Sequence, residues 1–186
     1  MSRWPGAPLS EEANALLRAA GRGPLLPDEV SATRPRLDRA AIEALLPHRG
    51  RSLLLDEVLA IEPARGLISA GYDLDPGRAV FAEHFPGRPV WPGLLQVEAI
   101  GQAGLLLMLE SRRGRREALP DPDDAADEPF AHALTHVLWA RFVRPVEPGG
   151  RLVIGAAVVE DGLFHLVVGQ CLKEGRVSSV AVLSGV

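Results

Sequence analysis

The sequence has 186 residues, 47% of them hydrophobic and 24% charged, a composition typical of a globular protein with one core, and we expect one domain. The formal net charge of -4 and the isoelectric point near 5.7 give no overall basic field, and no local basic patch is evident, so nucleic acid is not expected as a partner. The one cysteine, Cys171, excludes an internal disulfide framework and a multi-cysteine zinc site, and is consistent with a reducing compartment.

Residues 1 to 35 are predicted to form an appended arm with one short helix in SEEANALLRAAG. Ser10 can cap this helix, two acids occupy its first turn, and Gly21 can end it. The N-terminus lacks the apolar stretch of a signal peptide, and its prolines and acids do not suit a mitochondrial targeting helix. We therefore expect a cytoplasmic protein.

The main domain is predicted to span residues 36 to 186. It should open with a helix from Asp38 to Leu46, which begins at an aspartate cap and stops before Pro47. Residues 52 to 61 and 66 to 75 are aliphatic runs bounded by turn formers, which is typical of strands. The next stretch, GRAVFAEHFPGRPVWPG, has prolines at 86, 89 and 92 that fix the backbone and remove donors, so we expect an ordered, irregular loop.

Residues 93 to 110 are predicted to form a long central helix. Apolar residues occupy nearly every face, which indicates a helix surrounded by protein. The segment approaches the length of a membrane span, but Gln96, Glu98 and Gln102 would each be costly in lipid. No membrane span is therefore expected.

Residues 111 to 130 place a basic cluster before an acidic, proline-containing one, which predicts a flexible surface insertion. Four strands are expected after it, near residues 136 to 146, 151 to 160, 163 to 173 and 176 to 184. Asp161-Gly162 and Glu174-Gly175 are two-residue hairpin signals. This order of elements predicts an α+β domain whose antiparallel sheet wraps the central helix.

Two side chains near the start of that helix suggest chemistry. Glu98 lies between Val97 and Ala99, where desolvation opposes ionisation unless the carboxyl points to a rim or pairs with an arginine. His84 precedes a loop stiffened by prolines and glycines, which can hold an imidazole in a fixed place. Either residue alone is as consistent with a structural role. Their combination in HFPGRPVWPGLLQVEAIGQAG favours a catalytic pair.

This segment resembles the active-site loop and helix of the 3-hydroxyacyl-(acyl carrier protein) dehydratases of type II fatty acid synthesis. LDRAAIEALLPHR, LLLDEVLAIEP and ARFVRPVEPGGRL are similar to further segments of that family, so the resemblance covers residues 36 to 186. It implies a hot-dog fold, in which an antiparallel sheet wraps a long central helix. It also implies an enzyme that removes water from a 3-hydroxyacyl thioester.

Five residues are candidates for roles in this reaction, and the resemblance implies that His84 and Glu98 meet from two subunits. His84 would act as general base, and Glu98 of a partner subunit as the acid. Alternatively, Glu98 orients a water while His84 handles both protons. The backbone N–H of Gly93 would donate to the thioester oxygen. Gln102 could support the Glu98 carboxyl from the next helical turn or make a simple polar contact. Trp91 would line the acyl tunnel or pack in the core.

The same resemblance implies an acyl carrier protein as partner and a homodimer, or a heterodimer with a related subunit; a trimer of dimers is also compatible with it. Arg88, Arg141 and Arg144 are candidates for contacts with the acidic carrier. No cofactor is expected. No metal site is expected either, because His132 and His136 have helical spacing but lead into a strand and lack a third ligand.

Several alternatives stay open. His48 in LPHR is interpreted as structural and Cys171 as a packing residue. Gly50-Arg51-Ser52 replaces the bulky stretch usual in the family, which leaves fatty acid and specialised polyketide pathways both possible. The rival functions are a dehydratase that also isomerises the double bond, a noncatalytic subunit that binds an acyl carrier, and a thioesterase. Related bifunctional enzymes usually carry Asp where Glu98 stands, which weighs against the first.

Overall fold

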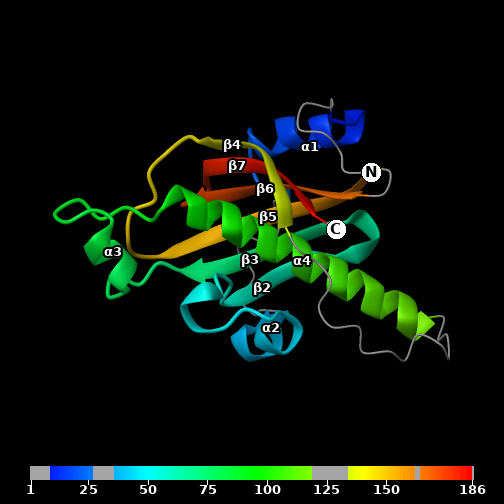
Figure 1. The fold of residues 1–186 in the computed structure, drawn as a ribbon, viewed down its shortest axis with the longest axis horizontal. Helices are drawn as coiled ribbons and strands as arrows, with labels where there is room; N and C mark the ends of the chain where they lie inside the picture. Colours follow the sequence, from blue (N-terminus) through cyan, green and yellow to red (C-terminus); the bar gives the residue numbers. More distant parts are fainter. Residues whose placement is uncertain (1–8, 27–35, 119–133, 162–163, 186) are drawn as a thin grey trace.

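The strands form one antiparallel sheet that wraps around the longest helix (Figure 1). The structure, a computed structural model, describes residues 9–26, 36–118, 134–161 and 164–185. Across the sheet the strand order is β1-β2-β3-β5-β6-β7-β4. In chain order the strands are β1 (Leu37–Asp38), β2 (Glu57–Glu62), β3 (Leu67–Asp73), β4 (Leu134–Phe142), β5 (Arg151–Asp161), β6 (Phe164–Lys173) and β7 (Arg176–Gly185).

The helices are α1 (Glu11–Ala20), α2 (Arg39–Leu45), α3 (Ala79–Glu83) and α4 (Gly93–Ala118), with short 3-10 turns η2 (Gly50–Ser52) and η3 (Pro63–Arg65). The two predicted caps are confirmed: the Ser10 hydroxyl accepts from the N–H of Ala13, and the Asp38 carboxylate accepts from the N–H of Ala41. Each cap satisfies a backbone donor that the first turn of a helix leaves unpaired.

Two sequence predictions need correction. Residues 111–118 were expected in a surface loop but continue α4, because a solvated helix end needs good helix formers and no apolar stripe. The remainder of that predicted loop lies outside the described residues. The proline-rich loop also contains the short helix α3, which ends before the first of its three prolines.

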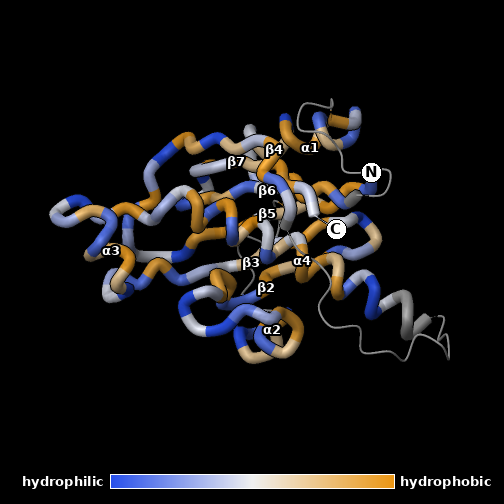
Figure 2. The backbone as a smooth tube through the Cα atoms, in the orientation of Figure 1, coloured by the Kyte–Doolittle hydropathy of each residue, from blue (hydrophilic) through white to orange (hydrophobic). Residues whose placement is uncertain are grey.

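The sheet is buried on both faces. On β6, Val167 and Cys171 belong to the main core against α4, whereas Leu166 and Val168 pack on the other face with Ala13 of α1. Figure 2 shows the hydrophobic residues gathered along the central strands and the polar character of the far end of α4. The arm predicted at the N-terminus is therefore part of the packed domain through α1.

The helix α4 is a core helix in this fold. Residues Gly93–Gly114 have the length and hydropathy of a membrane span, but over half of that segment is buried inside the protein. Core helices pass the same test of length and composition. The prediction of a helix surrounded largely by protein is confirmed for the face turned to the sheet.

The strand β4 forms one edge of the sheet and pairs only with β7 among the described strands. Among the described residues, large apolar side chains are exposed on and just after β4, in the loop before α4 and in the first turn of α4. They are Phe85, Leu94, Val137, Trp139, Phe142 and Val143. An unpaired strand edge with an apolar surface is a site where another chain can pair.

Close packing between α4 and β6 generates a stability prediction. A Cβ at Gly104 would come within 2.6 Å of the Val167 side chain, whereas a Cβ at Gly114 would meet nothing within 4 Å. Gly104→Ala should lower the free energy of unfolding by about 1–3 kcal/mol, because β-branched Val167 has little freedom to withdraw. Gly114→Ala on the same helix should raise it by about 0.5–1 kcal/mol. Urea unfolding measures both, and equal effects would contradict the close approach.

Candidate active site

The loop between α3 and α4 is closed by a tight turn next to His84. The N–H of Arg88 donates to the carbonyl of Phe85 at 3.0 Å. Pro86 occupies the second position of this turn, and Gly87 the third with a φ of 78°. Proline followed by a residue with positive φ is the pattern of a type II turn, which glycine adopts without strain. The segment HFPGR therefore folds locally into a fixed corner.

The ring of His84 is oriented by the same loop. Its Nδ1 lies 2.8 Å from the carbonyl oxygen of Val90, and the N–H of Val90 donates to the carbonyl of His84 at 2.8 Å. Because a carbonyl can only accept, Nδ1 carries the hydrogen and Nε2 keeps its lone pair. The ring also stacks on Phe85 with centroids 4.0 Å apart. His84 is thus prepared to accept a proton at Nε2.

The loop is anchored in the core by Trp91. Its side chain is 1% exposed and stacks on Tyr72 with ring centroids 5.1 Å apart. Its backbone N–H donates to the carbonyl of Val146 at 2.7 Å. Of the two roles predicted for Trp91, core packing matches this position, and the lining of an acyl tunnel stays a prediction.

The carboxyl of Glu98 is held by Gln102, one helical turn further along α4. The Gln102 amide nitrogen donates to Glu98 Oε1 at 2.9 Å and to the carbonyl of Ser52 at 2.7 Å. The Gln102 amide oxygen accepts from the N–H of Leu54 at 2.8 Å. Both ends of the amide are fixed by backbone groups, so its nitrogen must face the carboxyl. The hydrogen bond expected from the i, i+4 spacing is present.

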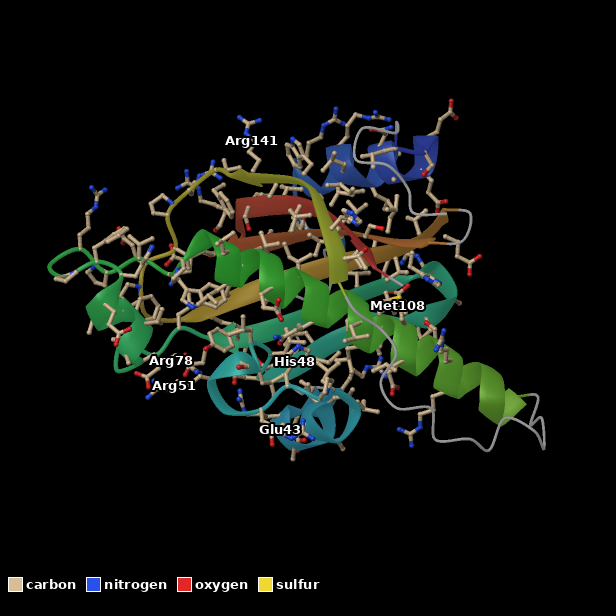
Figure 3. The ribbon with its side chains drawn as sticks, viewed as in Figure 1. Glu43, His48, Arg51, Arg78, Met108 and Arg141 are labelled. Atoms are coloured by element: carbon tan, nitrogen blue, oxygen red, sulfur yellow. The ribbon has the colours of Figure 1, made fainter. Side chains whose placement is uncertain are left out.

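A residue that sequence reasoning treated as structural also lies at this carboxyl. Nε2 of His48 is 3.5 Å from Oε1 of Glu98, and Nδ1 of His48 is buried without a hydrogen-bond partner. Figure 3 places His48 between the α2 region and α4. The two residues are 50 positions apart in the sequence. No short-range pattern indicated their contact, although both lie in segments that resemble the dehydratases.

The Glu98 side chain is more exposed than its apolar neighbours suggested, at 43%. Leu94, one turn earlier on α4, is 76% exposed. Residues four apart share a helix face, so Glu98 and Leu94 lie on a face of α4 that the chain itself leaves open. The expectation of a desolvated carboxyl is therefore not met within one chain.

The remaining predicted site residues lie around this open region or on the surface. Gly93 is the first residue of α4, where helical N–H groups lack intrahelical partners, and the Phe142 ring leaves no room for a Cβ there. Arg88 and Arg141 are exposed, and Arg144 donates to the carbonyl of Val177 at 2.6 Å. Figure 3 shows Arg141 pointing away from the protein.

The described residues contain no hydrogen bond or ion pair that links His84 to Glu98. Among them there is also no group of three His, Cys, Asp or Glu side chains that could hold a metal ion. His132, one of the two histidines considered for a metal site, lies outside the described residues. One chain therefore supplies each predicted catalytic group without bringing the two together.

Cys171 is fully buried, and its surroundings fit the packing role predicted for it. Burial raises the pKa of the Cys171 thiol to about 12, while a contact with Ser179 acts weakly in the opposite direction. A thiol that stays protonated at neutral pH is a poor nucleophile. We therefore assign Cys171 no chemistry.

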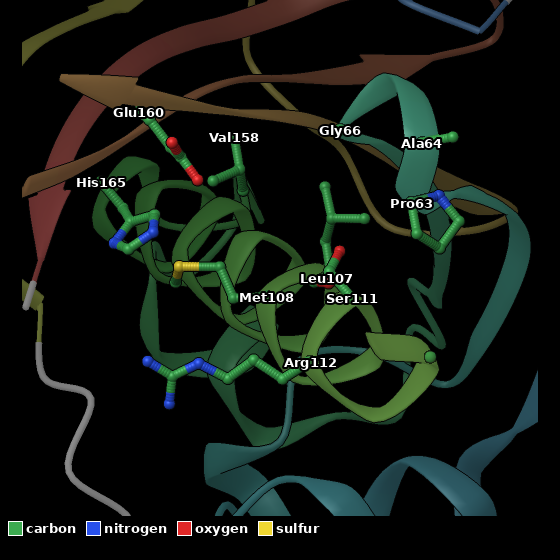
Figure 4. A pocket seen from close by; sticks show the side chains of 11 residues that line it. Pro63, Ala64, Gly66, Leu107, Met108, Ser111, Arg112, Val158, Glu160 and His165 are labelled. Carbon is green, nitrogen blue, oxygen red and sulfur yellow. The ribbon is translucent and has the colours of Figure 1, made fainter. Parts of the chain in front are cut away.

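A cavity of about 410 Å³ lies toward the far end of α4, away from His84 and Glu98 (Figure 4). Its lining includes Met108 and Arg112 of α4, Glu160 of β5 and His165 of β6. Neither predicted catalytic residue contributes to it. The groups oriented for proton transfer lie instead near the first turns of α4.

Comparison with known proteins places this arrangement in a family. A FabA-like domain model matches residues 46–176. The 3-hydroxyacyl-[acyl-carrier-protein] dehydratase FabZ of Anaeromyxobacter sp. is 39% identical over 146 residues, which cover 78% of this chain and 86% of that protein. The FabZ of Nitrosospira multiformis is 36% identical over 149 residues, which cover 79% and 94%. The solved dehydratase heterocomplex ApeI:P from Xenorhabdus doucetiae has a TM-score of 0.58 at 18% identity, over 77% of this chain and 88% of that chain.

The sheet-wrapped helix and the structural likeness define the chain as an α+β protein of the hot-dog fold. The family model covers more than half of the chain, and the relatives are matched over most of their length. The chain therefore belongs to the FabZ 3-hydroxyacyl-[acyl-carrier-protein] dehydratases, within the FabA-like domain family. The family resemblance and the hot-dog fold inferred from the sequence are confirmed.

The network around Gln102 predicts a large effect from one substitution. Gln102→Met keeps the size of this buried side chain but leaves the N–H of Leu54 and the carbonyl of Ser52 without partners. It should lower the free energy of unfolding by about 1–3 kcal/mol. Gln96→Met is the matched control on α4, because Gln96 is buried and its amide oxygen has no partner. Thermal unfolding compares the two, and an equal loss in both would contradict the network.

Proposed function

We propose that the chain removes water from a 3-hydroxyacyl thioester on an acyl carrier protein, giving the trans-2-enoyl thioester, in a site shared by two subunits. The observation that carries this proposal is a pair of side chains prepared for opposite proton transfers. His84 has its Nδ1 bonded and Nε2 available, and Glu98 has Oε1 bonded and Oε2 available. Membership of the FabZ family supports the reaction, since both relatives are named for it.

A second subunit is needed because the two groups do not meet within one chain. The exposed apolar side chains lie beside both of them: Phe85 follows His84, and Leu94 shares a helix face with Glu98. On β4, Val137 and Phe142 are exposed on the face turned toward α4 and extend this apolar surface, whereas Trp139 lies on the opposite face. A partner that pairs along β4 would cover this surface and desolvate the Glu98 carboxyl. We expect a homodimer, or a heterodimer with a related subunit, and a trimer of dimers is compatible with it.

The proposed reaction divides dehydration into two proton transfers. His84 of one subunit takes the C2 proton at Nε2, and Glu98 of the other subunit gives its proton to the C3 hydroxyl, which leaves as water. A carboxyl covered by the partner would stay protonated more readily than one in water. The alternative in which Glu98 orients a water, and His84 handles both protons, uses the same two residues.

The thioester oxygen gains negative charge as the C2 proton leaves. The backbone N–H of Gly93 is a free donor at the start of α4, where the helix dipole also favours negative charge. A donor of this kind contributes roughly 3 kcal/mol to transition-state stabilisation in other oxyanion holes. We therefore assign Gly93 to the thioester oxygen.

The pathway is fatty acid synthesis, or a specialised polyketide-type synthesis that uses the same chemistry, and we place the protein in the cytoplasm.

The acidic carrier protein would meet exposed arginines near the mouth of the site. Arg88, in the loop that holds His84, and Arg141, on β4, are exposed, and Arg144 follows at the end of that strand. Opposite charges at such a rim mainly raise the association rate.

The two catalytic residues can be tested separately and in combination. His84→Ala and Glu98→Gln should each abolish most turnover while leaving the melting temperature and the dimer intact. The assay follows the loss of one water mass from 3-hydroxyacyl carrier substrates of several chain lengths by mass spectrometry. Normal turnover in either variant would remove that residue from the mechanism. Release of the free carrier thiol would indicate hydrolysis and contradict the proposed reaction.

Co-expression of the two inactive variants tests the shared site. A mixed dimer of His84→Ala and Glu98→Gln has one site with both residues intact and one with neither. Random pairing should therefore restore about a quarter of wild-type turnover, since about half of the dimers are mixed and each has one working site. If each site lies within one chain, co-expression restores nothing.

Charge reversal tests the proposed carrier contacts. Arg88→Glu and Arg141→Glu should slow turnover of the carrier-bound substrate by about 10-fold, through a lower kcat/KM at low salt, and change a small pantetheine thioester little. Arg65→Glu is the control, because Arg65 is exposed on η3. Equal slowing of both substrates would count against a carrier contact.

A further inference from the structure

We propose that His48 is a positioning residue for the Glu98 carboxyl: with Gln102 it holds Oε1, so that Oε2 alone carries and delivers the proton. This inference rests on the proposed dehydratase function and adds a residue to the same site. It starts from a contact between helix α4 and the segment after α2, which are far apart in the sequence: Nε2 of His48 lies 3.5 Å from Oε1 of Glu98.

Of the two carboxyl oxygens of Glu98, Oε2 is the one that can carry the proton. The Gln102 amide has both of its ends fixed by backbone groups of Ser52 and Leu54, so a hydrogen of its nitrogen points at Oε1. An oxygen that accepts this hydrogen bond does not also present a proton in that direction. Oε2 has no hydrogen bond to any other described residue, and it is the oxygen open to a substrate.

We expect the His48 ring to carry its hydrogen on Nε2. Its Nδ1 is buried without an acceptor, so a hydrogen there would be a buried, unpaired donor. The tautomer with its hydrogen on Nε2 avoids this penalty and puts the hydrogen on the ring nitrogen that lies beside Oε1 of Glu98. The separation of 3.5 Å is longer than a strong hydrogen bond. Contacts of this kind are often long in empty sites and shorten when substrate binds.

The backbone of His48 is held in place by the neighbouring Arg49. The Arg49 guanidinium donates to the carbonyls of Leu46 and His48 at 2.5 and 2.8 Å, and Leu46 is buried in the main core. His48 is therefore held by the segment that follows α2 and not by α4. Two separate parts of the fold, one carrying His48 and one carrying Gln102, converge on the same carboxyl oxygen.

This arrangement has a defined role in the reaction. The hydrogen on Oε2 passes to the C3 hydroxyl, the C–O bond breaks, and water leaves; the C2 proton passes to Nε2 of His84 as the C=C bond forms. Glu98 is then a carboxylate, and the two donors at Oε1 stabilise its new charge. His48 contacts neither the substrate nor the reacting atoms, so it acts through Glu98.

Three variants test the inference. His48→Phe, which has no donor, should lower kcat by about 10-fold or more and change KM by less than about twofold. His48→Gln places an amide nitrogen close to the position of Nε2 and should recover most of the loss. His165→Phe is the control, because His165 is partly buried at the cavity toward the far end of α4, and turnover of this variant should be unchanged. Wild-type kcat in His48→Phe, or equal losses in His48→Phe and His48→Gln, would overturn the proposal.

A double-mutant cycle separates action through Glu98 from a general structural effect. In the Glu98→Gln background no carboxyl proton remains to be positioned, so adding His48→Phe should lower the residual single-turnover rate by less than about twofold. A further loss as large as in the wild-type background would overturn the proposal. If wild-type protein fails to dehydrate the carrier substrate, the proposed function fails too. If it dehydrates normally and only these variants disagree, His48 alone is reassigned.

Discussion

The geometry of the site depends on one buried amide. Gln102 of α4 is 1% exposed and bonds backbone groups of Ser52, the last residue of η2, and of Leu54, which precedes β2. The segment that leads into β2 is thus joined to α4 through this side chain. The same amide nitrogen reaches Glu98. Because a buried amide must pair both of its ends, its orientation is not free, and the direction of the carboxyl follows from the packing of the domain.

Much of this arrangement could be predicted from the sequence. Turn chemistry in HFPGRP and the Ser10 and Asp38 caps act over a few residues, so their patterns specify local structure directly. The i, i+4 spacing similarly anticipated the Glu98–Gln102 bond. The contact of His48 with Glu98 could not be anticipated, since it depends on how the segment after α2 packs against α4. Whether the Glu98 carboxyl is buried or points to a rim was left open, because an apolar neighbourhood in the sequence does not reveal which helix face the chain leaves uncovered.

The sequences of the central strands contain information that the prediction of an appended N-terminal arm did not use. Strands covered on one face alternate apolar and polar residues, whereas β5 has apolar residues and glycine from Leu152 to Val159, and β6 and β7 contain shorter apolar runs. Such runs indicate cover on both faces. The second cover is α1, which lies outside the residues that the family model matches, and its residues Ala13 and Ala20 are fully buried against the sheet.

The position of α1 limits how copies of this protein can assemble. The helix α1 lies on the convex face of the sheet. It fills the space that a second sheet would need in order to stack on this face, since stacked sheets approach to about 10 Å. Contacts between copies are then left to the edge of the sheet, to the exposed face of α4, or to other parts of the surface. The helix α1 thus restricts the geometry of any larger oligomer from the face of the sheet opposite α4.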